Sequence, residues 1–173
     1  MLINHYKKIV IWTPFKNYSS SLNMYLRQRG FIMTFGPQPS IGYEKKKLTV
    51  HTNEIFDESE KYQFILPIRN PYTRVVSQWK YHCMTCGDIK FEEWFWKYSR
   101  ITIMLPVARL YKYDRIIKTE NITEELKNLN LYYEAFPTVN KSRDDLGHSL
   151  SEKEKELIYY LHYEDFIAGN YEK

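Results

Sequence analysis

The sequence predicts an α/β fold in which a central parallel sheet is flanked by helices, within a single domain that spans residues 1–173. Short apolar runs of the length of buried strands alternate with segments whose apolar residues recur at helical spacing. Strand–turn–helix units in series form parallel sheets covered by helices. The composition agrees with this fold class, because 43% hydrophobic and 27% charged residues are ordinary usage for a globular domain that buries its own core.

Three strands and two helices are predicted in the first part of the chain. Apolar runs predict strands at residues 8–12, 31–35 and 62–68. The first helix carries Leu22, Tyr25 and Leu26 at helical spacing and ends at Gly30, a residue type that favours helix ends. A short second helix is predicted at residues 53–59.

The longest predicted helix follows the strand at residues 62–68. Asn70 is a typical N-cap residue, Pro71 suits the first helical position, and the helix continues towards Cys83. Later elements are helices at residues 91–98, 120–129 and 151–162, and a strand at residues 115–118. The last of these helices begins with a Ser-x-x-Glu capping box, formed by Ser151 and Glu154.

Charge and apolar content exclude several classes of protein. The net charge of +4 favours an anionic ligand or nucleic acid without choosing between them. No stretch approaches the roughly 18 apolar residues of a membrane span, and residues 1–8 lack the core of a signal peptide, so we expect a soluble, cytoplasmic protein. Cys83 and Cys86 have C-x-x-C spacing without a second cysteine pair, so we expect two plain thiols and no metal.

The first candidate site joins the first predicted strand to its helix, at residues 13–22. Backbone N–H groups at a helix start are unpaired, and the helix dipole adds positive charge there. Three serines, Ser19 to Ser21, supply hydroxyl donors, and Lys16 supplies a charge for a phosphate or sulfate oxygen. A Ser-rich helix cap beside a solvated lysine is the alternative interpretation. The segment has no glycine before its lysine, so it is not a Walker A loop.

The second candidate site follows the strand at residues 62–68. Arg69 stands at the end of that strand and Ser77 lies two turns into the next helix, where both side chains can bind the same phosphate. A structural ion pair is the alternative role for Arg69. Arg74, in the same helix, is expected at the surface or at the helix cap. Because ligands bind beyond the carboxyl ends of parallel strands, two anion sites at this edge suit a ligand with two separated phosphates.

Both segments resemble motifs of the sulfotransferases that use 3'-phosphoadenosine-5'-phosphosulfate (PAPS), particularly the carbohydrate branch that includes Golgi enzymes. Lys16, Ser20 and Ser21 fall on the lysine and hydroxyl positions of the family's 5'-phosphosulfate loop, P-K-x-G-[GS]-[ST]-[ST]. Residues 69–77 match the 3'-phosphate motif R-[ND]-P-x-x-R-x-x-S, which is the more specific of the two. The resemblance spans nearly the whole chain at low density.

Four weaker resemblances lie in the family's order. Residues 50–55 are similar to the segment H-A-T-A-x-E-I, and residues 118–122 are similar to R-F-E-N-L. Residues 140–143 are similar to a late N-x-S loop, and residues 163–171 to the end of the family's domain.

The resemblance implies a P-loop-like three-layer fold, PAPS as the sulfuryl donor and no metal. It implies Lys16 and His51 as the catalytic residues, with Glu54 as an alternative base. The implied cofactor-binding residues are Lys16, Asn17, Tyr18, Ser19, Ser20, Ser21, Arg69, Ser77 and Arg143. The implied acceptor is a hydroxyl on a glycan or a small molecule, and nucleic acid is not an expected partner.

Three other functions remain open at this stage. A nucleotide kinase or other P-loop NTPase would require magnesium and ATP, although the loop lacks the Walker pattern. A non-catalytic module for nucleic acid or another anionic polymer would use the mild positive charge and the many aromatic residues. A sulfotransferase that binds PAPS without turnover is the third, because Phe15 separates Pro14 from Lys16 and Tyr18 replaces a small residue.

Overall fold

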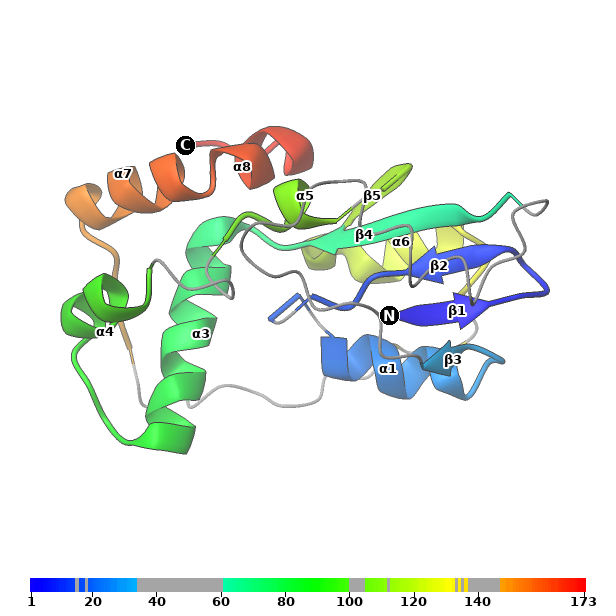
Figure 1. Cartoon of the computed structure of the whole chain (residues 1–173), viewed down its shortest axis with the longest axis horizontal. Helices are drawn as coiled ribbons and strands as arrows, with labels where there is room; N and C mark the ends of the chain where they lie inside the picture. The colour runs from blue at the N-terminus through cyan, green and yellow to red at the C-terminus, as the bar shows by residue number, and fades with distance from the viewer. Residues whose placement is uncertain are drawn as a thin grey trace.

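Five strands form one mixed sheet in the computed structural model, which describes residues 1–14, 16–17, 19–33, 61–99, 105–111, 113–132, 134, 136 and 147–173. The strands are β1 (Leu2–Asn4), β2 (Ile9–Ile11), β3 (Ile32–Met33), β4 (Gln63–Ile68) and β5 (Arg115–Lys118). Their order across the sheet is β3-β1-β2-β4-β5 (Figure 1). The predicted α/β class is therefore confirmed.

The predicted purely parallel sheet is wrong at one edge. β2, β4 and β5 are parallel, as the alternating pattern predicts, but β1 pairs antiparallel with both β2 and β3. The sequence analysis missed β1, because three residues are too short a run to show a strand pattern. A turn at residues 5–8 reverses the chain into β2, and a hairpin of this kind can only produce antiparallel neighbours.

Most helices lie where the sequence predicts them. They are α1 (Ser19–Arg27), α3 (Pro71–Cys86), α4 (Phe91–Tyr98), α5 (Val107–Leu110), α6 (Ile122–Asn128), α7 (Glu152–Leu161) and α8 (Tyr163–Gly169). A 3-10 turn, Thr119–Asn121, precedes α6. The sequence analysis missed α5 and α8, which have four and seven residues. The helix predicted at residues 53–59 lies outside the described residues.

Both predicted helix starts are confirmed by their caps. The Asn70 side chain accepts a hydrogen bond of 2.9 Å from the Tyr72 backbone N–H, and Pro71 is the first helical residue. Ser151 and Glu154 form the predicted capping box, in which each side chain bonds the other residue's backbone N–H. Local chemistry therefore decides where α3 and α7 begin.

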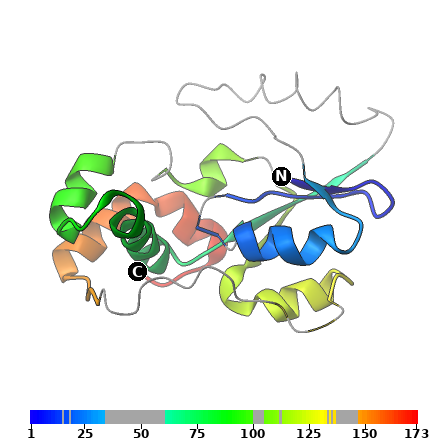
Figure 2. The same ribbon diagram turned by 90° about the horizontal axis from the view of Figure 1, so that it is seen from below.

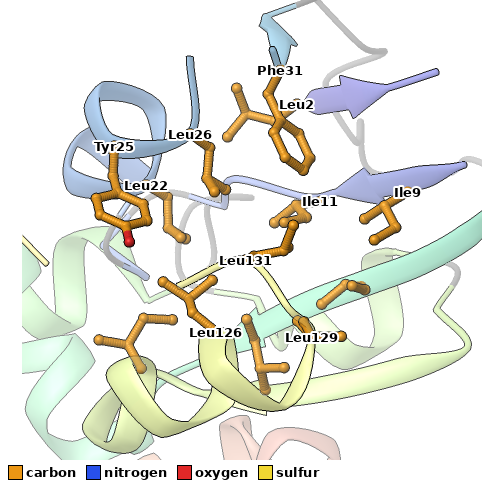
Figure 3. Packing of buried hydrophobic residues seen from close by; sticks show 13 residues of the cluster. Leu2, Ile9, Ile11, Leu22, Tyr25, Leu26, Phe31, Leu126, Leu129 and Leu131 are labelled. Atoms are coloured by element: carbon orange, nitrogen blue, oxygen red, sulfur yellow. The ribbon is translucent and has the colours of Figure 1, made fainter. Parts of the chain in front are cut away.

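Helices cover both faces of the sheet. Figure 2 shows α1 (blue) and α6 (yellow) side by side on one face. Their leucines, including Leu22, Leu26 and Leu126, point towards one another and towards Ile11 of β2 in a buried cluster (Figure 3). On the opposite face, Leu66 and Ile68 of β4 pack with residues of α5 and α8.

A second group of helices packs together beside the sheet. α3, α4, α7 and α8 bury a cluster rich in aromatic side chains, including Trp79, Phe91, Trp94 and Phe166. The α3 helix leads directly from the carboxyl end of β4 into this group, as Figure 1 shows. No helix in the described part of the chain combines the length and apolar character needed to span a membrane.

The prediction that Arg74 lies at the surface or at the helix cap is wrong, because this side chain is fully buried within α3. Its Nη2 lies 3.0 Å from Asp165 Oδ2 and 2.8 Å from His162 Nδ1. Since a guanidinium only donates, Nδ1 of His162 accepts and the ring is neutral. Burial and the Arg74 charge accordingly lower the pKa of His162 well below its usual value. Asp165 also accepts from the backbone N–H groups of Val107 and Ala108, so Arg74 connects α3 to α5 and α8.

The variant Arg74→Met should destabilise the fold by about 3–5 kcal/mol, because it leaves Asp165 buried without its cation. Urea unfolding followed by circular dichroism would measure the free energy. Arg109→Met is the matched control, since Arg109 is exposed on α5 and its loss should cost less than about 0.5 kcal/mol. A loss below about 1 kcal/mol for Arg74→Met would contradict the structural role of the ion pair.

Candidate anion-binding site

The two predicted anion-binding segments follow neighbouring parallel strands. β2 pairs with β4 in a register that places Ile11 beside Ile65, and the Trp12 backbone N–H donates to the Ile65 carbonyl at 3.0 Å. The two segments that follow these strands leave the sheet at the same edge. The first leads into α1 and the second into α3. Neighbouring strands lie about 4.8 Å apart, so side chains from the two junctions can reach one ligand.

Lys16 is held in an unusual backbone conformation. Its φ is +63°, in the left-handed region that residues with a Cβ rarely adopt. Its half-buried amine lies 4.1 Å from the centroid of the Tyr81 ring, a cation–π contact that links the loop to α3. Backbone strain of this kind persists where the surrounding structure enforces it, and it is concentrated at functional sites.

The charge of Lys16 is affected by Arg69. Burial, and secondly the positive charge of Arg69, lower the pKa of Lys16 to about 8. A positive charge near a lysine disfavours its ammonium form. The geometric link between the loop and the second segment is the contact of Lys16 with Tyr81, which lies on the helix that follows Arg69.

The other loop residues differ in their accessibility. Asn17 is fully buried, its backbone N–H donates to the Pro14 carbonyl at 3.2 Å, and its side-chain amide has no hydrogen-bond partner among the described residues. Ser19 is half-buried, Ser20 is exposed, and Ser21 is buried in the first turn of α1. Ser19 and Ser20 are therefore the hydroxyls of this segment that a ligand can reach.

Arg69 is oriented by the first turn of the helix that follows it. Its Nε donates to Thr73 Oγ1 at 3.1 Å, and that hydroxyl lies 3.0 Å from the Asn70 carbonyl, to which it can donate. The two terminal nitrogens of Arg69 have no hydrogen-bond partner within the described ranges. They are consequently available to a carboxylate, sulfate or phosphate group.

Arg69 and Ser77 line the same pocket, which has a volume of about 470 Å³. It lies between one side of α3 and the segment that leads into α7, and its lining residues are Arg69, Tyr72, Thr73, Val76, Ser77, Lys80, His148, Leu150 and Lys155. The lining contains three permanently basic side chains and neither Asp nor Glu. A concave site with this excess of positive charge is suited to an anionic ligand.

Glu120 supports the start of α3 from the 3-10 turn that follows β5. Its Oε1 accepts a hydrogen bond of 2.7 Å from the Asn70 backbone N–H, and its Oε2 lies 2.8 Å from the Tyr171 hydroxyl. The sequence analysis noted the segment at residues 118–122 without assigning Glu120 a role. The structure shows that Glu120 fixes the residue that follows Arg69, so it positions the site.

Several predicted residues lie outside the described part of the chain. These are the candidate bases His51 and Glu54, and the predicted cofactor contacts Tyr18 and Arg143. Where the structure describes the chain, no three His, Cys, Asp or Glu side chains are grouped so that they could hold a metal ion. Cys83 is buried and Cys86 exposed, both as free thiols.

No family model, curated protein or solved structure matches this chain. Fold and site together define an α/β protein with a basic pocket at the carboxyl edge of parallel strands. The particular function has to be argued from the residues of that pocket.

Lys16→Gly should be more stable than Lys16→Ala by about 1 kcal/mol, because only glycine adopts a left-handed φ without a Cβ penalty. Both variants lose the amine, so their difference reports the backbone alone. Chemical unfolding would measure it. The same pair at Glu156, which is exposed inside α7, should give the opposite order, with glycine less stable by about 1 kcal/mol. Equal stability of the two Lys16 variants would rule out strain at this position.

Proposed function

We propose that this protein is a PAPS-dependent sulfotransferase with a P-loop-like fold, which transfers a sulfuryl group to an acceptor hydroxyl, with carbohydrate as the favoured acceptor class. One observation carries the proposal. Arg69 and Ser77, the residues that the 3'-phosphate motif marks, line one basic pocket, and the motif lysine Lys16 contacts Tyr81 of α3, the helix that carries Ser77.

The ligand that suits this arrangement has anionic groups at two ends. PAPS carries a phosphosulfate at its 5' position and a phosphate at its 3' position. Arg69 and Ser77 would bind the 3'-phosphate, while Lys16, the accessible Ser19 and Ser20, and the first backbone N–H groups of α1 would bind the 5' end. A ligand bound in this way spans the adjacent ends of β2 and β4.

The chemistry required of the site is the stabilisation of a leaving group. As the sulfur–oxygen bond to the 5'-phosphate breaks, negative charge develops on the phosphate oxygens, and the Lys16 ammonium would stabilise it. A pKa of about 8 leaves most Lys16 side chains charged at neutral pH. The acceptor oxygen forms the new bond to sulfur and gives its proton to a base, for which the resemblance suggests His51, or else Glu54.

The first test separates this function from its rivals by ligand stabilisation. The product 3'-phosphoadenosine-5'-phosphate at a hundredfold excess over its Kd should stabilise the protein by about 2.7 kcal/mol, or roughly 5–10 °C in Tm. ATP with magnesium should give little stabilisation, whereas a nucleotide kinase would show the reverse. Arg69→Ala should remove most of the shift, and Arg109→Ala should keep it.

Turnover is tested by the transfer of radiolabelled sulfate from PAPS to a panel of glycans and small alcohols. Transfer to any of these acceptors supports catalysis. Stabilisation by the bisphosphate without transfer would instead support a binding protein derived from an enzyme. Salt-sensitive binding of nucleic acid without any response to the bisphosphate would reject the proposal.

Affinity for the bisphosphate should fall as the pH rises above the Lys16 pKa of about 8. A bound anion favours the charged lysine, so binding takes up a proton once Lys16 has titrated, and the affinity should drop by about tenfold between pH 7.5 and pH 9.5. Calorimetry over this range would measure the change. Lys16→Met should bind more weakly at pH 7.5 and lose most of the pH dependence; an unchanged dependence would assign the titration to another group.

A further inference from the structure

The basic pocket contains more positive charge than the two motif residues supply. Arg69 provides one positive charge, and Ser77 provides only a hydroxyl. Lys80 and Lys155 add two further cations to the lining, although no motif marks either of them. Since neither Asp nor Glu lines the pocket, these charges are not balanced within it.

Lys80 lies on the same side of α3 as the motif residues. It follows Ser77 by three residues and Thr73 by seven, spacings that return to one face of an α-helix, and all three residues line the pocket. Lys80 is half-buried, and no hydrogen bond or ion pair joins it to another described residue. Its ammonium group is therefore available to an anion bound in the pocket.

Lys155 reaches the pocket from the opposite wall, on α7. Its Nζ lies 2.6 Å from Glu152 Oε1, but Glu152 is one helical turn away and its side chain is 89% exposed. Exposed ion pairs of this kind contribute about 0–1 kcal/mol, so Lys155 can turn to a bound anion at small cost. His148 lies beside Glu154 instead, at 3.3 Å, and adds little net charge.

We propose that Lys80, with a smaller contribution from Lys155, makes this pocket selective for a phosphate monoester, so that a nucleoside 3',5'-bisphosphate binds in preference to a 5'-monophosphate. A phosphate monoester carries a charge of about −1.5 to −2 near neutral pH, which one arginine cannot balance. Lys80 supplies the second positive charge, next to the Ser77 hydroxyl. The inference rests on the proposed function, because it concerns the same nucleotide.

Calorimetry with 3'-phosphoadenosine-5'-phosphate and with 5'-AMP tests the proposal, through the ratio of their two Kd values. In Lys80→Gln the ratio should fall by about tenfold or more, because a charge-assisted contact to the 3'-phosphate is lost while the affinity for 5'-AMP is unchanged. Lys155→Gln should lower the ratio by a smaller factor. Lys80→Arg keeps the charge and should retain the ratio to within about threefold. Lys153→Gln removes an exposed charge from α7 outside the pocket and should have no effect.

The outcomes separate this inference from the function on which it rests. If the unaltered protein prefers the bisphosphate and Lys80→Gln keeps the same ratio, the role of Lys80 is rejected and the function stands. If the unaltered protein binds both nucleotides equally, or neither, the proposed function fails together with the inference. Thermal unfolding without ligand identifies a variant that loses binding because it is misfolded, and in that case Lys80→Met, which also removes the charge, replaces Lys80→Gln in the same measurement: a retained ratio rejects the role of Lys80 and a lowered one supports it.

Discussion

The parallel pairing of β2 with β4 is the interaction on which the rest of the site depends. It places the carboxyl ends of two strands at one edge, in a register where Ile11 lies beside Ile65. The chain therefore leaves the sheet twice at this edge, first through the loop that carries Lys16 and then, after β4 has run three residues further to Ile68, through Arg69. Without this pairing, two segments separated by about fifty residues of sequence would have no reason to share a ligand.

A buried ion pair fixes the helix that carries most of the pocket. Arg74 points away from the pocket towards Asp165, while Thr73, Ser77 and Lys80 of the same helix line it together with Arg69, which precedes the helix. Asp165 also caps the start of α5 through two backbone N–H groups, so the orientation of α3 is coupled to the opposite face of the sheet. A buried pair of this kind is a weak source of net stability, but it strongly disfavours any arrangement that separates its partners.

The site combines a strained backbone with positive charges that lie outside bulk solvent, and a bound anion would reduce the cost of those charges. Lys16 has a left-handed φ, and burial and the like charge of Arg69 lower its pKa to about 8. Lys80 is half-buried in the pocket that Arg69 also lines, and no described acidic residue pairs with it. An anion bound at these groups would offset their positive charge, which is the physical basis of the recognition that we propose.

The α/β class, the positions of most helices and strands, and the starts of α3 and α7 could all be predicted before the fold was known. Those features depend on local chemistry, such as the Asn70 cap and the Ser151–Glu154 box, which a few adjacent residues contain. The sequence also marked Lys16, Arg69 and Ser77. The antiparallel edge of the sheet, the burial of Arg74 and the positions of Lys80 and Lys155 in the pocket follow from the three-dimensional fold. Each of these depends on contacts between distant segments, so charge and spacing within one segment cannot distinguish a buried arginine from an exposed one, or a pocket lysine from a solvated one.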